Sequence, residues 1–278
     1  MSEIASSAQP TVSTSTAPPL TVSSVTKTYR SRRRGTVTAV KDVSFDIPPG
    51  AAVSLVGASG SGKSTLAKLI TAVERPTSGT ITFGDLDVGA LRGRHALRRY
   101  RSDVQMVFQD PYGALNPLHT VEYTVSRPVR NFLGLSAAQT AERVRDLLEI
   151  VGLVPAEQFL AKLPHQLSGG RRQRVVIARA LAAEPKLMIA DEPVSMLDVS
   201  LRAGVLGLLA KLRAEHGLSL LYITHDLLSA RAVTDRILVL HNGVLVESGD
   251  TKQVLQHPQD AYTVALLDAV PNPFGRSG

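Results

Sequence analysis

Short apolar runs alternate with helical spacing along the chain after residue 50. The run at 51–56 is followed by glycine and suits a buried strand, and 63–72 then predicts a helix. Further strand-like runs lie at 104–108, 187–190 and 218–224. Strand, helix and strand in this order predict a parallel sheet that is covered by helices.

The segment 201–216 separates the last two of these runs and has the spacing of an amphipathic helix. Its apolar stripe consists of Leu201, Val205, Leu208, Leu209 and Leu212. Gly217 follows directly, at the position where glycine commonly ends a helix. We therefore expect one long helix between these two strands.

Two regions depart from this alternation. Residues 20–50 have alternating, β-branched character and end in Pro48-Pro49-Gly50, which predicts an antiparallel sheet closed by a turn. Apolar runs at 237–240 and 244–246 flank His241-Asn242-Gly243, and Asn-Gly between apolar runs is a strong hairpin signal.

The strand signal disappears between 115 and 167. Within this region, 137–151 has helical spacing through Val144, Leu147, Leu148 and Val151. We interpret the region as a mainly helical insertion in the α/β core.

The composition fits a folded protein with a substantial core. The chain has 278 residues, 44% of them hydrophobic, which allows one large domain or two small ones. No apolar run approaches the roughly 18 residues of a membrane span. The sequence has no cysteine, which excludes disulfides and thiolate metal sites and fits a reducing compartment. Residues 1–19, rich in Ser, Thr, Ala and Pro, lack the pattern of a secretory signal and predict a disordered tail.

The net charge is +7, and much of the excess lies in two arginine clusters. They are Arg30, Arg32, Arg33 and Arg34, and Arg92, Arg94, Arg98, Arg99 and Arg101. Such clusters suit a nucleic-acid or anionic membrane surface, or ordinary solvated faces and charge near phosphate. We favour the second interpretation because the arginines lack the regular alternation with aromatic residues that single-strand binding requires.

The segment 57–64 matches the phosphate-loop pattern G-x-x-x-x-G-K-[ST], with a predicted strand before it and a predicted helix after it. It reads Gly57-Ala58-Ser59-Gly60-Ser61-Gly62-Lys63-Ser64, and Thr65 follows. The glycines allow backbone N–H groups to surround phosphate oxygens, and the helix N-terminus adds partial positive charge. Lys63 is placed to reach the β- and γ-phosphates, and the Ser64 hydroxyl to bind Mg²⁺. The alternative, a Gly/Ser-rich turn with a chance lysine, is disfavoured by the flanking strand and helix.

An apolar strand at 186–192 ends in two carboxylates, Asp191 and Glu192. Asp191 is suited to holding Mg²⁺ through water, and Glu192 to polarising an attacking water. An ordinary strand end would explain the same residues. The phosphate loop in the same chain favours the catalytic interpretation.

Residues 167–174 read Leu-Ser-Gly-Gly-Arg-Arg-Gln-Arg and begin another predicted helix, with Ser168 as its N-cap. Gly169 and Gly170 at the helix start would expose backbone donors for an anion. Simple capping explains the segment equally well, so these residues alone leave both interpretations open.

Together, the motifs resemble the ATPase subunits of ABC transporters over residues 20–273. Their order is the order of that family: phosphate loop, Gln109, the signature at 167–174, Asp191-Glu192, the segment 195–198 and His225. The resemblance implies an α/β fold, a phosphate-loop NTPase (RecA-like) core with an antiparallel β subdomain and a helical signature subdomain. The implied boundaries are 20–50 for the antiparallel region, 51–111 and 171–250 for the ATP-binding core, 112–170 for the helical subdomain and 251–273 for a C-terminal tail.

The resemblance also implies roles for single residues. Tyr29 would stack on adenine, and 57–65 would bind the phosphates of ATP. Gln109 would reach Mg²⁺ and the attacking water, His225 would contact the γ-phosphate, and Asp198 would lie at the interface between two ATPase subunits. A core aromatic, a loop cap and a structural histidine are the alternatives for Tyr29, Gln109 and His225, and the motif order favours the functional roles.

One position departs from the family pattern. The signature usually reads L-S-G-G-Q, and Arg171 stands here in place of glutamine. Ser168 and Gly170, the donors expected to face phosphate, are present, so we expect activity to survive. Arg171 would either tighten nucleotide binding or meet an acidic partner, and the sequence does not choose between these.

Residues 109–117, 191–198 and 257–271 resemble the peptide and nickel importer branch of the family. The branch implies import of an oligopeptide or dipeptide, with nickel and oligosaccharides as alternative solutes. Many peptide-branch ATPases carry a cysteine cluster, and the absence of cysteine excludes such an iron–sulfur site here.

The implied mechanism is closure of a head-to-tail dimer, with ATP between 57–65 of one subunit and 168–170 of the other. The implied partners are a second ATPase subunit, more often a related chain than an identical one, two permease subunits and an extracytoplasmic solute-binding protein. Residues 112–117 would contact the permease, so the chain would lie peripherally at the cytoplasmic face of the membrane.

Two other function classes fit less well. A soluble ABC-type ATPase acting on nucleic acid or ribosomes is supported only by the positive charge, and we expect no specific nucleic-acid partner. A nucleotide-binding regulator without turnover is disfavoured by Glu192 and His225, since a non-catalytic member could lose either.

Overall fold

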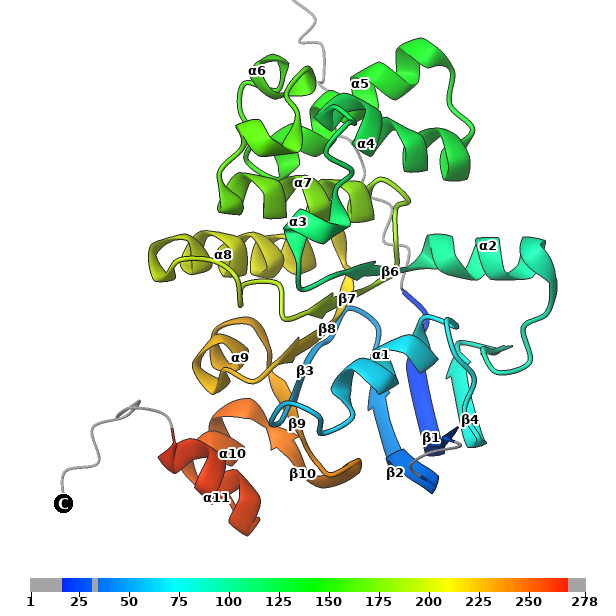
Figure 1. Ribbon diagram of the computed structural model, residues 1–278, viewed down its shortest axis with the longest axis vertical. Coiled ribbons are helices and arrows are strands. Elements are labelled where there is room, and N and C mark those ends of the chain that lie inside the picture. Colours follow the sequence, from blue (N-terminus) through cyan, green and yellow to red (C-terminus); the bar gives the residue numbers. More distant parts are fainter. Residues whose placement is uncertain (1–16, 32–34, 270–278) are drawn as a thin grey trace, which may run out of the picture.

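The computed structural model describes residues 17–31 and 35–269. Most of the predicted tail at 1–19, the cluster residues Arg32, Arg33 and Arg34, and 270–273 of the predicted C-terminal tail lie outside the described residues. The described chain forms two β-sheets with helices packed around them (Figure 1). Within these ranges, no helix combines the length and the apolar character needed to cross a bilayer.

The first sheet is antiparallel and has the strand order β2-β1-β4-β5. The strands are β1 (Leu20–Ser31), β2 (Gly35–Ile47), β4 (Ser78–Phe83) and β5 (Leu86–Asp87). β1 and β2 pair from Leu20 opposite Ile47 to Ser31 opposite Gly35. The antiparallel region predicted for 20–50 is therefore confirmed. β4 and β5 extend it from a segment in which only Ile81 and Phe83 are buried, too few for a clear sequence pattern.

The second sheet has the order β10-β9-β3-β8-β7-β6. Its strands are β3 (Ala52–Val56), β6 (Val104–Val107), β7 (Leu187–Asp191), β8 (Ser219–Thr224), β9 (Arg236–His241) and β10 (Val244–Asp250). Neighbours from β9 to β6 are parallel, and every residue of β3 and β8 is buried because helices cover both faces. The Asn242-Gly243 turn folds β10 back antiparallel on β9, so the predicted hairpin is confirmed.

Helices cover the two faces of this sheet. The helices outside the region between β6 and β7 are α1 (Lys63–Ile70), α2 (Gly93–Asp103), α8 (Val199–His216), α9 (Leu227–Val233), α10 (Thr251–Gln256) and α11 (Ala261–Asp268). α1 shares one hydrophobic cluster with the antiparallel sheet, and α8 packs in another. Four of the five predicted stripe residues of α8 are buried, but Leu201 is 37% exposed because it lies over Gly170 rather than in the core.

The region between β6 and β7 is helical, as predicted, and Figure 1 shows it gathered at one end of the molecule. It contains α3 (Pro111–Ala114), α4 (Val121–Pro128), η1 (Val129–Leu133), α5 (Ala137–Ile150), α6 (Glu157–Leu160), η2 (Pro164–Gln166) and α7 (Gly169–Leu181). A reciprocal capping box of Ser136 and Gln139 begins α5. Further along the helix, α5 buries Val144, Leu147 and Leu148.

The second arginine cluster lies on α2 and holds that helix in place. The Arg92 guanidinium donates to the Gly89 carbonyl at 2.8 Å, and Arg101 donates to the Ala72 carbonyl at 3.0 Å. Arg98 donates to the Asn131 carbonyl of η1 and so connects α2 to the helical region. These three exposed guanidinium groups therefore bond to main-chain carbonyls of the same chain.

The β9–β10 turn packs against the segment that follows β3. Asn242 and Gly243 both have positive φ, 48° and 80°. The Gly243 N–H donates to the Ser61 carbonyl at 2.9 Å, and the Gly243 carbonyl accepts from Lys41 N at 2.8 Å. A Cβ atom on Gly243 would lie 2.8 Å from the Ala39 carbonyl oxygen, so only glycine fits this position.

We expect Gly243→Ala to lower the free energy of unfolding by about 2 kcal/mol or more, because it combines a left-handed φ with a main-chain clash. Gly207→Ala in α8 is the matched control, since a Cβ there meets no atom within 4 Å. The control should be about 0.5–1 kcal/mol more stable than the unchanged chain. Urea unfolding measures both, and equal stability of the two variants would contradict the assigned role of the turn.

Candidate functional site

The loop 57–65, Gln109, Asp191, Glu192 and His225, all assigned to chemistry from the sequence, meet at the carboxyl ends of the parallel strands, where open α/β sheets bind their ligands. Gly57 follows β3, Gln109 comes shortly after β6, and His225 follows β8. Gln109, His225 and most of the loop after Gly57 border a cleft of about 850 Å³. Its lining from the predicted site is Ala58, Ser59, Gly60, Gly62, Lys63, Ser64, Thr65, Gln109, Asp191, Glu192 and His225.

Close main-chain contacts shape the phosphate loop. A Cβ on Gly57 would lie 2.2 Å from the Leu240 carbonyl oxygen, and one on Gly62 would lie 2.4 Å from the Ala39 carbonyl oxygen. Gly62, at φ 110°, is also the N-cap of α1, so the helix N-terminus faces the cleft. Neither position accepts a side chain. The fold around the loop therefore requires glycine at both positions.

Lys63 lies buried under the loop. Its Nζ donates to the carbonyls of Gly57 at 2.7 Å and Ala58 at 2.9 Å. Burial lowers the pKa of Lys63, and the negative charges of Glu192 and Asp191 oppose that shift. The ammonium is therefore positioned in a poorly hydrated environment, where its attraction to an anion is strong.

Asp191 ends β7 and accepts a hydrogen bond from the Ser64 hydroxyl at 3.3 Å. Burial raises its pKa, and the neighbouring Glu192 charge raises it further, while the Ser64 hydrogen bond and the Lys63 charge act in the opposite direction. Without a ligand, two adjacent carboxylates next to a buried lysine reduce the stability of the folded protein. The arrangement is suited to a cation and a polyanion bound together.

Glu192 is held on both sides. Gln109 Nε2 donates to its Oε2 at 2.9 Å, and His225 Nδ1 lies 3.1 Å from its Oε1. The residue has φ 45°, an uncommon conformation for a side chain this size, and its N–H donates to the Ile223 carbonyl at 2.8 Å. A carboxylate oriented in this way at the mouth of a cleft can act as a general base.

Tyr29 lies on β1, and its hydroxyl donates to Glu74 Oε2 at 2.6 Å. Burial raises the pKa of Tyr29, and the hydrogen bond from Tyr29 lowers that of Glu74. Lys27 pairs with the same carboxylate at 3.2 Å and lies 5.0 Å from the centre of the Tyr29 ring. Among the described residues, Tyr29 is not part of the cleft lining, so its stacking on adenine stays a prediction.

The signature residues lie apart from this cleft. Ser168 is the N-cap residue of α7, as predicted. Its hydroxyl makes no capping hydrogen bond to the first turn of this described helix. Of the described residues that line the cleft, none belongs to 168–171. Arg171 is exposed, with its guanidinium carbon 5.5 Å from the centre of the Phe159 ring. Asp198, the N-cap residue of α8, is also exposed.

Several residues of the site were not predicted. Arg202, Asp226, Leu266 and Ala269 also line the cleft. In addition, the Tyr262 hydroxyl on α11 accepts a hydrogen bond from the Ala58 N–H at 2.8 Å. A helical pattern of Tyr262, Leu266 and Leu267 was available in the sequence and would have indicated that this tail packs on the core.

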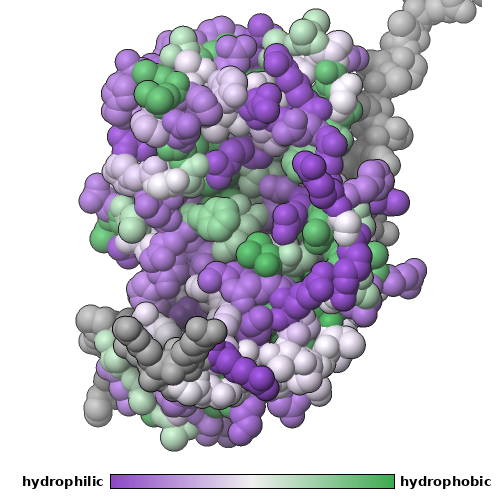
Figure 2. Space-filling model, turned by 45° about the vertical axis from the view of Figure 1, so that its right-hand side comes forward, coloured by the Kyte–Doolittle hydropathy of each residue, from purple (hydrophilic) through white to green (hydrophobic). Residues whose placement is uncertain are grey.

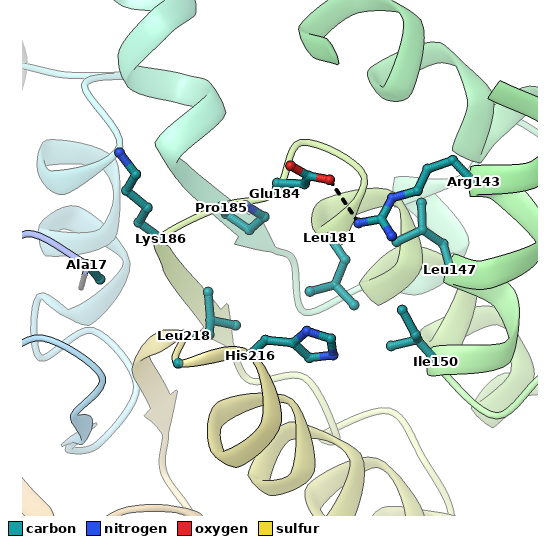
Figure 3. A pocket seen from close by; sticks show the side chains of 11 residues that line it. Ala17, Arg143, Leu147, Ile150, Leu181, Glu184, Pro185, Lys186, His216 and Leu218 are labelled. Atoms are coloured by element: carbon teal, nitrogen blue, oxygen red, sulfur yellow. Dashed lines mark hydrogen bonds and ion pairs between the residues drawn. The ribbon is translucent and has the colours of Figure 1, made fainter. Parts of the chain in front are cut away.

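A second pocket of about 430 Å³ lies at the opposite, amino ends of β7 and β8 (Figure 3). Arg143 of α5 donates to Glu184 Oε1 across it at 3.1 Å, and Lys186 and His216 line it from other segments. It contains none of the residues that the sequence assigns to chemistry. The cleft at the carboxyl ends is the stronger candidate for a nucleotide.

Replacing Asp191 by asparagine should stabilise the nucleotide-free chain near pH 7, because it removes a half-buried charge next to Glu192. We expect the melting temperature to rise on the order of 2–4 °C. Since the pKa of Asp191 is raised, the folded state takes up a proton before the unfolded state as pH falls. The advantage of the variant should therefore shrink on acidification and vanish below the ordinary value of 3.8.

Calorimetry at several pH values tests this expectation. Asp85→Asn, which neutralises an exposed carboxylate next to β5, is the matched control and should leave the melting temperature unchanged. A lower melting temperature for Asp191→Asn at pH 7 would contradict the electrostatic account.

Known proteins share much of this sequence. The family model described as ABC transporter matches residues 40–195. The oligopeptide transport ATP-binding protein OppF of Lactococcus lactis subsp. lactis (strain IL1403) is 44% identical over 236 residues, which cover 85% of this chain and 73% of OppF. The peptidoglycan transport ATP-binding protein YejF of Agrobacterium fabrum is 46% identical over 243 residues, 85% of this chain but 44% of YejF.

Solved structures agree as well. A dimer of the ATP-binding cassette MJ0796 in a post-hydrolysis state, bound to ADP and Pi, superposes with a TM-score of 0.75 at 33% identity and covers 84% of this chain and 98% of that one. CbiO1 of Clostridium perfringens, part of the ABC transporter complex cbiONQ, superposes with a TM-score of 0.76 at 29% identity. The match covers 87% of this chain and 92% of CbiO1. The predicted phosphate-loop NTPase fold is confirmed. This chain belongs to the ABC transporter family, as an ATP-binding subunit that hydrolyses ATP.

Proposed function

We propose that ATP is hydrolysed in the cleft at the carboxyl ends of the strands, with Glu192 polarising the attacking water. The observation that supports this is the orientation of its carboxylate by two neighbours. Gln109 Nε2 donates to Oε2 at 2.9 Å, and His225 Nδ1 lies 3.1 Å from Oε1. Water attacks the γ-phosphorus, its proton passes toward Glu192, and the bond to the β-phosphate oxygen breaks to release ADP and phosphate.

The phosphates of ATP are bound by residues 57–65. The N-terminus of α1 directs N–H groups and partial positive charge into the cleft. On binding, the Lys63 ammonium exchanges the Gly57 and Ala58 carbonyls for β- and γ-phosphate oxygens, because charged acceptors make the stronger hydrogen bonds. His225, next to Glu192, contacts the γ-phosphate and senses its loss.

Ser64, Asp191 and Gln109 are the proposed Mg²⁺ ligands. They supply hydroxyl, carboxylate and amide oxygens, which Mg²⁺ prefers, and two of them already meet at 3.3 Å. The described residues contain no cluster of three or more His, Cys, Asp or Glu suited to a metal, in keeping with an ion that takes most ligands from water and phosphate. Bound there, Mg²⁺ would neutralise phosphate charge and so relieve the two adjacent carboxylates.

The cleft becomes complete when a second ATPase subunit supplies its signature. The exposed Ser168, and Gly170 beside it, lie at the N-terminus of α7, where an anion is favoured. ATP bound by 57–65 of one subunit then contacts 168–170 of the other, and Asp198 lies at the interface. Loss of the γ-phosphate removes contacts made only in the closed state, and the dimer opens. Arg171 is exposed and free to meet either the nucleotide or an acidic partner residue.

The permease contact is proposed at residues 112–117. Tyr112 is 57% and Leu118 83% exposed, and a pocket of about 490 Å³ lined by Val73, Met106 and Phe108 lies next to the loop. Figure 2 shows hydrophobic side chains gathered in a hollow between the upper and lower parts of this face. A short amphipathic helix fits such a hollow. The Arg172 guanidinium lies 4.2 Å from the centre of the Tyr112 ring, which joins this surface to α7.

The solute is proposed to be an oligopeptide or dipeptide, since the relatives named above are oligopeptide and peptidoglycan transport proteins and 109–117 and 257–271 carry the features of that branch. The partners are then two permease subunits, a related ATPase chain and an extracytoplasmic solute-binding protein. The chain works as a peripheral subunit at the cytoplasmic face of the membrane.

Glu192→Gln should keep ATP binding and lower turnover by about a hundredfold or more, the scale expected for loss of a positioned base. Glu184→Gln makes the same chemical change in the second pocket and should alter turnover by less than about twofold. Phosphate release and binding of a fluorescent ATP analogue measure the two properties separately. Turnover near the original value in Glu192→Gln would remove that residue from its role.

The solute assignment is tested on the chain purified with its membrane subunits. We expect a solute-binding protein loaded with peptide to increase ATP turnover several-fold, whereas DNA and RNA should have no effect. Stimulation by a nickel- or oligosaccharide-loaded protein instead would overturn the peptide assignment. Stimulation by nucleic acid alone would overturn the transporter role.

A further inference from the structure

A tyrosine from the end of the chain reaches the phosphate loop. Tyr262 lies on α11, and its hydroxyl accepts a hydrogen bond from the Ala58 N–H at 2.8 Å. The two residues are 204 positions apart. Leu266 and Ala269, further along the same segment, line the nucleotide cleft. Part of the cleft lining is therefore supplied by α11 and the residue that follows it.

The start of α11 is held by a carboxylate of the core sheet. Glu247 on β10 accepts hydrogen bonds from the N–H groups of Gln259 at 2.9 Å and Asp260 at 3.2 Å. Asp260 in turn accepts from Tyr262 N at 2.8 Å and begins the helix. Leu266 and Leu267 pack against the cluster that contains Val56 and Leu227. The side chain of Tyr262 is thus directed by several contacts that do not involve the loop.

The ring of Tyr262 stacks on His241, with ring centres 3.8 Å apart. His241 ends β9, and two residues later the Gly243 N–H donates to the Ser61 carbonyl. The loop is therefore held at two points, by Tyr262 at Ala58 and by the β9–β10 turn at Ser61. Between them lie Ser59 and Gly60, which are exposed to the cleft.

We propose that Tyr262 is a positioning residue for ATP binding and that α11 sets the affinity of the chain for nucleotide. The Tyr262 hydroxyl occupies the Ala58 N–H and keeps the first half of the loop in one conformation, with the following N–H groups free for phosphate. The inference rests on the proposed function in one respect, that phosphate binds at residues 57–65.

The effect should fall on affinity rather than on the chemical step. A loop that is ordered before ATP arrives loses little conformational entropy on binding. A loop without the Tyr262 hydrogen bond must be ordered when ATP binds, and this entropy cost lowers the affinity for ATP. Once ATP is bound, the phosphates order the loop themselves. Glu192, Gln109 and His225, the residues proposed to carry out the reaction, are held by one another, whereas the Tyr262 hydroxyl bonds to Ala58.

Tyr262→Phe in the full chain is the direct test, because it removes the hydroxyl and keeps the ring on His241. We expect the dissociation constant for a fluorescent ATP analogue and the KM for ATP to rise about three- to tenfold, the factor that corresponds to one neutral hydrogen bond. The kcat should change by less than about twofold. Tyr123→Phe, which alters a 43% exposed tyrosine of α4, is the matched control. It should leave the dissociation constant, the KM and the kcat unchanged.

A second variant reaches the same contact without touching the cleft. Glu247→Ala removes the carboxylate that holds Gln259 and Asp260, and it should weaken ATP binding in the same direction. Because both changes act through one contact, the total fold-loss of ATP affinity in the double variant should be smaller than the product of the two single-variant losses. Full additivity, or no effect of Glu247→Ala, would overturn the role assigned to α11.

Three results would overturn the role of Tyr262: unchanged affinity in Tyr262→Phe, tighter binding, or a parallel fall of kcat and melting temperature, which marks a purely structural residue. Lys63→Ala in the same assay separates this inference from the proposed function. Loss of binding in Lys63→Ala with no change in Tyr262→Phe rejects the inference alone. Unchanged binding in Lys63→Ala rejects the phosphate site itself.

Discussion

The close approach of main chain to main chain around the phosphate loop is the constraint on which the rest of this structure depends. Gly57 lies against the Leu240 carbonyl and Gly62 against the Ala39 carbonyl, at separations that no Cβ atom permits. These contacts bring the antiparallel sheet, β9 and β3 together at one point. The loop therefore has its phosphate-binding shape because three separate segments hold it, and the helix α1 that follows is directed into the cleft for the same reason.

Around this rigid loop, the protein concentrates charges that are unfavourable without a ligand. Burial lowers the pKa of Lys63 and raises that of Asp191, so each charged form is less stable here than in water. Glu192 adds a second negative charge next to Asp191 in an uncommon backbone conformation. Such a site is less stable than a neutral one of the same shape, and it recovers that stability when a cation and a polyanion bind together.

The sequence was sufficient for every feature that depends on local pattern. Short apolar runs predicted the parallel strands, and Asn242-Gly243 between two such runs predicted the hairpin. The phosphate-loop pattern and the resemblance to ABC ATPases implied which residues belong to one site. Contacts between distant segments were not predictable in this way. The hydroxyl of Tyr262 on Ala58, the Lys63 ammonium on two carbonyls and Leu201 over Gly170 each depend on packing geometry. The missing capping bond of Ser168 is similar, since the N-cap position is local but the direction of its hydroxyl is not.

The position of α7 explains how one chain can connect two distant events. Its N-terminus carries the signature, which in this chain lies away from the nucleotide cleft. Four residues into the helix, Arg172 lies on the Tyr112 ring and donates to the Pro164 carbonyl at 2.7 Å, so the proposed permease surface and the signature belong to one packed unit. Through these contacts we expect a displacement of Tyr112 to move the N-terminus of α7 with it, because a packed helix transmits displacement instead of absorbing it. Transport then requires only that this unit has different contacts with and without the γ-phosphate of the partner's nucleotide.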